Sequence, residues 1–126
     1  MVPTVLVVDD DLLIRWSLRH ALEARGLRVL EAGCGAEAVL VARQHEVCVT
    51  VLDWSLPDGD GLTLLPLLAR ERPGCRILLL TAYASEELTL RALAAGVAQV
   101  LPKPFEIHDL VDRVAAEALT SHTIRP

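Results

Sequence analysis

The chain is poor in aromatic residues and contains a single lysine. Aromatic residues make up 3% of its 126 positions, and 11 of its 12 basic residues are arginine. Hydrophobic residues nevertheless make up 52%, so the predicted core is aliphatic, built from Leu, Val, Ile and Ala. A chain of this length corresponds to one ordinary domain.

Features of nucleic-acid-binding, membrane and secreted proteins are also missing. The net charge is −5 and the arginines are scattered singly, which argues against a basic surface for nucleic acid. No run reaches the roughly 18 apolar residues of a membrane span. Residues 1–4 carry no basic n-region, so we expect no secretory leader. These absences predict a cytoplasmic protein that contacts neither nucleic acid nor a membrane.

The cysteines and histidines show no metal-binding pattern. The cysteines are odd in number, far apart and never spaced as CxxC, which argues against zinc or a redox dithiol. We expect Cys34, Cys48 and Cys75 to be reduced thiols, with Cys48 packed inside a strand. The histidines are expected on the surface, at His20, His45, His108 and His122.

Short β-like runs alternate with longer helical patterns along the chain. Strands are expected at 4–8, 28–31, 47–52, 76–80 and 98–101, and helices at 11–25, 36–44, 62–72, 86–95 and 106–119. Five such units in alternation predict a parallel sheet with helices on both faces. We expect one domain over residues 1–120. Residues 121–126 are predicted to be a polar tail, or the start of a linker to an output domain not present here.

Local signals predict several helix ends. Gly26 and Gly96 suit the position just after a helix C-terminus, and Ser85 suits an N-cap. Proline is tolerated in the first turn of a helix but not in its interior. We therefore expect Thr63 to be the N-cap of the third helix, which places Pro66 in its first turn, or else a kink at Pro66.

Three of the strand-like runs stop abruptly at charged residues. The first runs into Asp9 and Asp10, the third into Asp53, and the fifth into the single lysine, Lys103. Because the carboxyl ends of parallel strands share one edge of a sheet, where ligands bind, we expect these side chains to meet. Such a set suits a divalent cation and a phosphoryl group. Thr81 ends the fourth strand, and its hydroxyl could donate to a phosphoryl oxygen.

Each of these residues also has a plainer interpretation. Asp53 could be a turn or cap aspartate, Lys103 could be an ordinary exposed lysine, and we expect Asp11 to cap the first helix. Capping by Asp11 leaves Asp9 and Asp10 unexplained, because adjacent carboxylates repel and need a counter-charge close by. Mg²⁺, a hard cation that prefers oxygen ligands, meets that need.

In this order and spacing, the motifs resemble the receiver domains of bacterial two-component response regulators. The resemblance runs from residue 4 to about residue 120 and implies a flavodoxin-like, doubly wound (βα)5 fold with strand order 2-1-3-4-5. The stretch Ile14-Arg15-Trp16-Ser17-Leu18 is most similar to receivers of the NtrC-like transcriptional activators. The resemblance is carried by Asp9-Asp10, by Asp53 with the following Trp54-Ser55-Leu56-Pro57-Asp58-Gly59-Asp60-Gly61, by Thr81-Ala82, and by Lys103-Pro104-Phe105.

The resemblance implies a phosphoacceptor and a metal site. Asp53 would take a phosphoryl group from a phosphohistidine on a sensor histidine kinase. Asp10, Asp53 and the main-chain carbonyl of Ser55 would hold Mg²⁺, with Asp9 acting through water. Phosphoryl transfer needs positioning and charge neutralisation more than covalent help from the protein, which agrees with this set of residues.

The remaining roles implied by the resemblance belong to a switch that is not an enzyme in its own right. Lys103 would pair with Asp53 and then with the phosphoryl group, and Thr81 would swing to hydrogen-bond that group. The Lys103–Pro104 peptide bond is expected to be cis. Phosphorylation would alter the surface of the fourth helix and fifth strand, and so control an output such as transcription.

Two residues depart from the pattern of the family. Receivers usually carry Tyr or Phe three residues before the lysine, and this chain has Val100 there, while Tyr83 follows Thr81 by two positions. We therefore expect the signal to pass through Thr81 and movement of the loop and helix over residues 82–96. Ser55 and Tyr83 flank the expected approach of water to the phosphoryl group, so we predict that they set its lifetime.

The fourth helix carries apolar residues on two faces. Leu90 and Leu93 fall on a face near Val100, away from the predicted core face. Isolated exposed aliphatic residues are normal, but a cluster beside a switch residue suggests a partner surface or a homodimer formed on phosphorylation. The core face is predicted from the repeat of Leu88, Ala92 and Ala95.

Two other functions remain open from the sequence. A phosphatase of the haloacid dehalogenase type could use Asp9-Asp10-Asp11 as a D-x-D pair, but it would leave Asp53 idle and lacks the expected Gly-Thr after the pair. Turnover of phosphomonoesters would discriminate it. A receiver-like interaction module that is never phosphorylated is the second alternative, and the full acidic and lysine set argues against it.

Overall fold

A sheet of five parallel strands forms the centre of the molecule. The computed structural model describes the backbone of residues 2–123 and the side chains of residues 2–120. The strand order is β2-β1-β3-β6-β7, which is the predicted 2-1-3-4-5 counted over parallel strands. The strands are β1 (Thr4–Val8), β2 (Arg28–Ala32), β3 (Val49–Asp53), β6 (Arg76–Thr81) and β7 (Gln99–Pro102).

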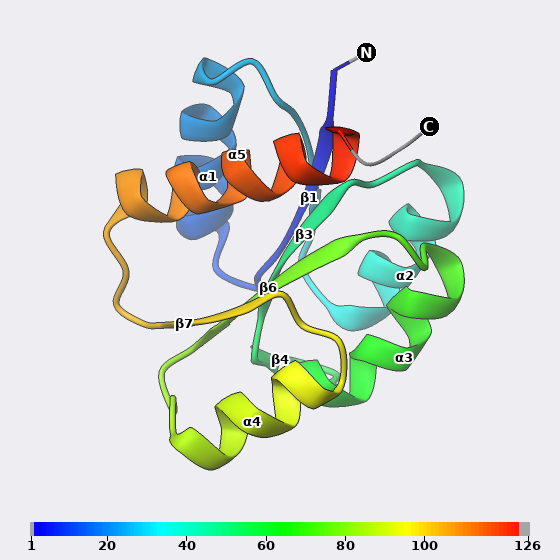
Figure 1. Cartoon of the computed structure of the whole chain (residues 1–126), viewed down its shortest axis with the longest axis vertical. Coiled ribbons are helices and arrows are strands. Elements are labelled where there is room, and N and C mark those ends of the chain that lie inside the picture. The colour runs from blue at the N-terminus through cyan, green and yellow to red at the C-terminus, as the bar shows by residue number, and fades with distance from the viewer. Residues whose placement is uncertain (1, 124–126) are drawn as a thin grey trace.

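Helices cover both faces of this sheet (Figure 1). On one face, α1 (Leu12–Ala24) and α5 (Ile107–Thr123) pack over the strands through residues such as Leu18, Leu22, Leu110 and Val114. On the other, α2 (Gly35–Gln44), α3 (Gly61–Glu71) and α4 (Glu86–Ala94) contribute Ala38, Ala42, Leu64, Leu68 and Ala92. Two separate aliphatic cores result, one on each side of the sheet. No helix within residues 2–123 is long and apolar enough to cross a membrane.

The register of the strands places their carboxyl ends side by side along one edge of the sheet. Strands β1 and β3 are buried along their whole length, as expected of continuous β-branched runs inside a parallel sheet. Val8 lies opposite Leu52, so the residue after β1 and the last residue of β3 share one level. Thr81 at the end of β6 lies opposite Pro102, which directly precedes Lys103.

A two-stranded hairpin follows β3 and was not predicted. Strands β4 (Ser55–Leu56) and β5 (Gly59–Asp60) pair antiparallel to one another and lie outside the main sheet. Residues 55–61 carry turn-forming Pro, Asp and Gly, and each strand has just two residues and no alternating pattern, so no periodicity in the sequence indicates the hairpin.

The predicted start of the third helix is wrong. Asp60, not Thr63, is the N-cap of α3: its carboxylate accepts a hydrogen bond from the backbone N–H of Thr63 at 2.9 Å. The helix therefore begins at Gly61, and Pro66 lies in its interior. An interior proline costs a helix about 3 kcal/mol because it removes one backbone hydrogen bond. The buried side chains of Leu64, Leu65 and Leu68 offset that loss by packing into the core.

Other local predictions have mixed outcomes. Asp11 and Ser85 cap α1 and α4 as predicted, and Gly26 and Gly96 take positive φ angles of 83° and 100° after those helices. Cys48 is buried but lies just before β3 rather than in it. Helix α5 continues past its predicted end to Thr123, and the last three residues of the predicted tail lie outside the described part of the chain.

The apolar residues at the start of α1 do not face the core. Leu12, Leu13 and Trp16 are more than half exposed, at 68%, 69% and 56%, whereas Leu18 and Leu22 are buried. The apolar residues of this helix are therefore only partly used in packing. Three large apolar side chains remain together on the surface, directly after the acidic residues that end β1.

Candidate functional site

The three predicted acidic residues meet at the carboxyl edge of the sheet. Asp9, Asp10 and Asp53 each place a carboxylate oxygen within 4.8 Å of the others, a spacing that can hold one metal ion. Asp9 and Asp53 are buried, with 2% and 5% of their surface exposed, while Asp10 is exposed. Oxygen ligands of this kind suit a hard divalent cation.

Lys103 closes the acidic cluster from the end of β7. Its Nζ lies 3.0 Å from Asp53 Oδ1 and 3.2 Å from Asp9 Oδ2, so one ammonium contacts two buried carboxylates. Burial alone would lower the pKa of Lys103, but the hydrogen bonds and charges of Asp53 and Asp9 outweigh it and raise that pKa. Lys103 is therefore fully charged at neutral pH. The peptide bond between Lys103 and Pro104 is cis, as predicted.

The carboxyl group of Asp53 is held in an unfavourable setting for a charge. Burial raises its pKa, the hydrogen bond from Lys103 partly opposes this, and the charge on Asp9 raises it further. The net result is a pKa above the ordinary value for aspartate. A folded state that binds a proton more tightly than the unfolded chain loses stability as pH rises through that range. A cation at the cluster would reverse this loss by favouring the ionised form.

Thr81 lies beneath the site and is tied to the next loop. It is completely buried, and its Oγ1 accepts a hydrogen bond from the backbone N–H of Tyr83 at 2.9 Å. The hydroxyl hydrogen remains available for another acceptor. Tyr83 itself is 71% exposed. A change in the hydroxyl of Thr81 would thus act directly on the backbone that leads to α4.

An open hollow of about 370 Å³ lies over Asp53. Its walls come from the acidic end of β1, the loop after β3 and the loop after β6. The backbone N–H of Ser55 lies 3.5 Å from Asp53 Oδ1, at the limit of a hydrogen bond. The lining residues are Asp10, Asp53, Trp54, Ser55, Leu56, Pro57, Ala82, Tyr83 and Lys103. The structure therefore brings Ser55 and Tyr83 together at this opening.

Asp58, which carries no predicted role, fastens the β4–β5 hairpin to α2. Its two carboxylate oxygens accept hydrogen bonds from the backbone N–H groups of Gly35, at 2.8 Å, and Ala36, at 2.9 Å. These bonds hold the pKa of Asp58 below its usual value. A Cβ atom on Gly35 would lie 3.1 Å from Asp58 Oδ1, so glycine allows the close approach. The only signal in the sequence was Asp58 within a run of turn residues, which does not reveal a distant partner.

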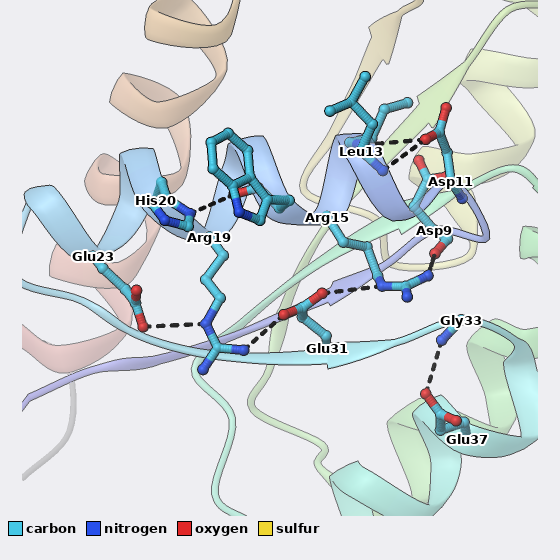
Figure 2. Close-up of polar contacts among 12 residues, drawn as sticks. Asp9, Asp11, Leu13, Arg15, Arg19, His20, Glu23, Glu31, Gly33 and Glu37 are labelled. Carbon is cyan, nitrogen blue, oxygen red and sulfur yellow. Dashed lines mark hydrogen bonds and ion pairs between the residues drawn. The ribbon is translucent and has the colours of Figure 1, made fainter.

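Charged residues of α1 and β2 hold the acidic end of β1 in place (Figure 2). Arg15 donates from Nη1 to the carbonyl oxygen of Asp9 at 2.7 Å and from Nε to Glu31 at 3.0 Å. Arg19 binds the other carboxylate oxygen of Glu31 at 2.7 Å. Burial opposes ionisation of Glu31, but the two arginines outweigh it and lower its pKa. In the sequence, Arg15 stands out only through the resemblance of residues 14–18 to one receiver subfamily.

The prediction of two apolar faces on α4 is only partly correct. Leu90 and Leu93 are exposed, at 60% and 46%, and α4 packs beside β7, where Val100 is half-buried. Ala95, predicted to face the core, is exposed because the helix ends at Ala94 and Ala95 is its C-cap. Of the predicted core face, Leu88 and Ala92 are buried.

Comparisons with known proteins identify the family of this chain. Residues 5–115 match the response regulator receiver domain family. The chain is 41% identical over 113 residues to the probable transcriptional regulatory protein TcrX of Mycobacterium tuberculosis, covering 90% of this chain and 48% of that protein. It is 35% identical over 118 residues to the DNA-binding transcriptional regulator NtrC of Escherichia coli, covering 94% of this chain and 25% of that protein. The chain therefore spans about half or less of these relatives.

Solved structures of similar proteins share the fold. A response regulator from Burkholderia pseudomallei, containing a phosphorylated aspartic acid, a calcium ion and citrate, superposes with a TM-score of 0.83 at 29% identity. The match covers 96% of this chain and 71% of that one. The beryllofluoride-activated NtrC4 receiver domain dimer gives a TM-score of 0.86 at 28% identity, covering 94% and 98%. From the match over residues 5–115, we conclude that this chain belongs to the response regulator receiver domain family, whose members are signalling switches of two-component systems.

Proposed function

We propose that Asp53 is the phosphoacceptor of this receiver and takes a phosphoryl group from a sensor histidine kinase. The observation that carries the proposal is the position of Asp53 at the floor of an open hollow, with Lys103 3.0 Å away and two more carboxylates around it. A carboxylate oxygen of Asp53 would attack phosphorus, and the bond between phosphorus and the donor histidine nitrogen would break. The product is an acyl phosphate on Asp53 and a neutral histidine on the kinase.

Receiver domains bind a divalent metal, and we propose Mg²⁺ for this chain. Asp10, Asp53 and the main-chain carbonyl of Ser55 would hold it directly, and Asp9 through water. The fit rests on three carboxylates whose oxygens lie within 4.8 Å of one another, and on the buried setting of Asp53, where burial and the charge of Asp9 raise its pKa. When bound, the cation supplies neutralisation of the negative charge on the phosphoryl oxygens.

The other residues of the site would act on the transferred group. Lys103, already paired with Asp53, would move its ammonium to a phosphoryl oxygen, and Thr81 would donate its hydroxyl hydrogen to another. Ser55 and Tyr83 line the opening through which water must approach, so they are proposed to set the lifetime of the acyl phosphate. Hydrolysis would return Asp53 to its carboxylate and release inorganic phosphate.

The proposed signal passes from Thr81 to α4 rather than through an aromatic residue at position 100. Because Thr81 Oγ1 holds the backbone N–H of Tyr83, recruitment of the hydroxyl to the phosphoryl group would pull on residues 82–96. The surface formed by Leu90, Leu93 and Val100 would then change and bind a partner or a second copy. We propose that residues 1–120 form the receiver and that the following residues lead toward an output region, such as a transcriptional one.

The kinase must approach Asp53 from the open side of the site. The exposed apolar residues Leu12, Leu13 and Trp16 lie directly after the acidic pair, at the N-terminal end of α1. Exposed apolar clusters of this kind mark interaction surfaces. They support the proposal that a protein, rather than only a small phosphodonor, docks beside Asp53.

The proposal is tested with the wild-type chain and Asp53→Asn. With Mg²⁺ and acetyl phosphate, we expect wild type to gain the mass of one phosphoryl group and Asp53→Asn to gain none. Asp60→Asn, which retains a side-chain oxygen to cap α3, is the matched control and should still be modified. Failure of wild type to accept a phosphoryl group or bind beryllofluoride would favour the interaction module that is never phosphorylated. Steady turnover of phosphomonoesters would instead favour a phosphatase.

A further inference from the structure

The backbone at the end of β1 is fixed from three directions. The N–H of Asp9 donates to the carbonyl of Ala32 at 3.1 Å, and the Asp9 carboxylate accepts from the N–H of Asp11 at 2.9 Å. The carbonyl oxygen of Asp9 accepts the short 2.7 Å bond from Arg15. That carbonyl belongs to the peptide unit that joins Asp9 to Asp10. The orientation of this peptide unit therefore depends on Arg15.

Asp10 has no support of its own. Within residues 2–120, its carboxylate makes no hydrogen bond or ion pair, although Asp9 and Asp53 are both held by Lys103. Its position within 4.8 Å of the other two carboxylates must come from the backbone that carries it. Arg15 is the side chain that holds that backbone at the peptide unit preceding Asp10.

Arg15 is itself held in place before any ligand binds. Its Nε is bound to Glu31 at 3.0 Å, and its side chain is only 18% exposed. Gly33 leaves the space that the guanidinium occupies, since a Cβ atom there would lie 3.3 Å from Arg15 Nη1. Strand β2, which carries Glu31, thus contributes to the site without supplying any of its ligands (Figure 2).

We propose that Arg15 is a positioning residue for the metal site: anchored by Glu31, it holds the peptide unit between Asp9 and Asp10 so that Asp10 points at the ion. The inference rests on the proposed function of the acidic cluster as a Mg²⁺ site. Charge alone predicts the opposite behaviour, because a guanidinium near the cluster repels a cation and its removal should tighten binding. The sign of the change therefore separates positioning from simple electrostatics.

The test measures Mg²⁺ affinity by isothermal titration calorimetry for wild type and Arg15→Gln. Loss of a residue that orients a metal ligand weakens binding by about ten- to hundredfold, and we expect a loss of about tenfold here. Arg19→Gln is the matched control, because Arg19 binds the same Glu31 but does not contact Asp9. It should stay within about twofold of wild type. Arg15→Lys, which can still donate to the carbonyl, should recover part of the loss.

A metal-free measurement keeps the inference separate from the proposed function. Amide hydrogen exchange of Asp10 and Asp11 should be faster in Arg15→Gln than in wild type, and unchanged in Arg19→Gln. If wild type binds no Mg²⁺, the proposed function fails, while faster exchange would still support the positioning role. Unchanged or tighter Mg²⁺ binding by Arg15→Gln, or unchanged exchange at both amides, would overturn it.

Discussion

Helix α2 and helix α4 lie on the same side of the sheet but are attached to it very differently. Both ends of α2 are fastened by side chains from outside it. Asp58, in the turn between β4 and β5, accepts from its first N–H groups, and Arg72, the C-cap of α3, donates to the carbonyls of Ala42 and His45 at 2.7 and 2.8 Å. A carboxylate at the N-terminus and a guanidinium at the C-terminus also complement the helix dipole. Little freedom remains for this pair of helices.

Helix α4 has no comparable attachment. Its N-cap bond from Ser85 is internal, and among residues with described side chains none in α4 forms a hydrogen bond or ion pair with another element. Leu88 and Ala92 are its buried contacts, while Leu90 and Leu93 are exposed. Elements with few buried contacts and few specific bonds open most readily. We therefore expect α4, the helix directly downstream of Thr81, to move more readily than α2 when the site is phosphorylated.

Thr81→Ala is expected to have the largest effect on the difference between α4 and α2. With Mg²⁺ and beryllofluoride, wild-type amide chemical shifts should change over residues 82–96 and little over α2. Thr81→Ala should still bind beryllofluoride but lose most of the change in residues 82–96, because the hydroxyl that links site and loop is gone. Thr81→Ser retains the hydroxyl and is the control. Equal shifts in Thr81→Ala and wild type would contradict this route, as would wild-type shifts that are as large in α2.

The second largest effect is expected for polar substitutions on the exposed face of α4, which should weaken the association of the phosphorylated chain. Fully burying a leucine side chain contributes about 1.5–3 kcal/mol, so Leu90→Asp combined with Leu93→Asp should reduce phosphorylation-dependent association about tenfold or more. Sedimentation analysis with and without beryllofluoride measures it. Leu40→Asp, an equally polar change at an exposed leucine on the fastened helix, is the control. Intact association in the double variant would remove α4 from the interface.

Substitution of the residues at the opening above Asp53 is expected to change the lifetime of the acyl phosphate severalfold. Ser55→Ala and Tyr83→Ala each alter a residue that lines the opening above Asp53. Decay of the phosphorylated form, followed by mass spectrometry after removal of acetyl phosphate, should change in rate in at least one of them. The claim fails if both variants decay at the wild-type rate.

The smallest effect is expected for Asp58→Ala, which removes the attachment of the N-terminus of α2 and should lower the stability of the domain. Asp58→Ala removes the acceptor for two backbone N–H groups, so the melting temperature at pH 7 should fall and exchange at Gly35 and Ala36 should rise. Because the pKa of Asp58 is lowered in the folded state, its contribution is complete above the ordinary aspartate pKa of about 4 and disappears as pH falls below it. The difference between variant and wild type should therefore shrink in acid. A difference that persists at low pH would contradict a role for the ionised carboxylate.

The side chains at the strand ends could be predicted from the sequence, whereas contacts between side chains and the backbone could not. The strand ends carrying Asp9, Asp53, Thr81 and Lys103 were predictable, because continuous apolar runs mark buried parallel strands and the fold brings their ends together. The contacts of Asp58 with α2 and of Arg15 with Asp9 were not, since both are made to backbone groups, which look the same at every residue. The interior position of Pro66 was also missed, because Asp60 begins the helix earlier than the proline suggests.

The position of Lys103 after the last strand of the sheet has a consequence for the newly made chain. Asp53 lies in the middle of the sheet, but its charge partner Lys103 follows β7, the edge strand and the last one in the sequence. A nascent or truncated chain that ends before β7 lacks Lys103, and it also lacks α5, whose Leu110 and Val114 lie in the core on the α1 side of the sheet. The charge partner of Asp53 and the helix that completes this core therefore come from the same final stretch of sequence, so an incomplete copy would lack both.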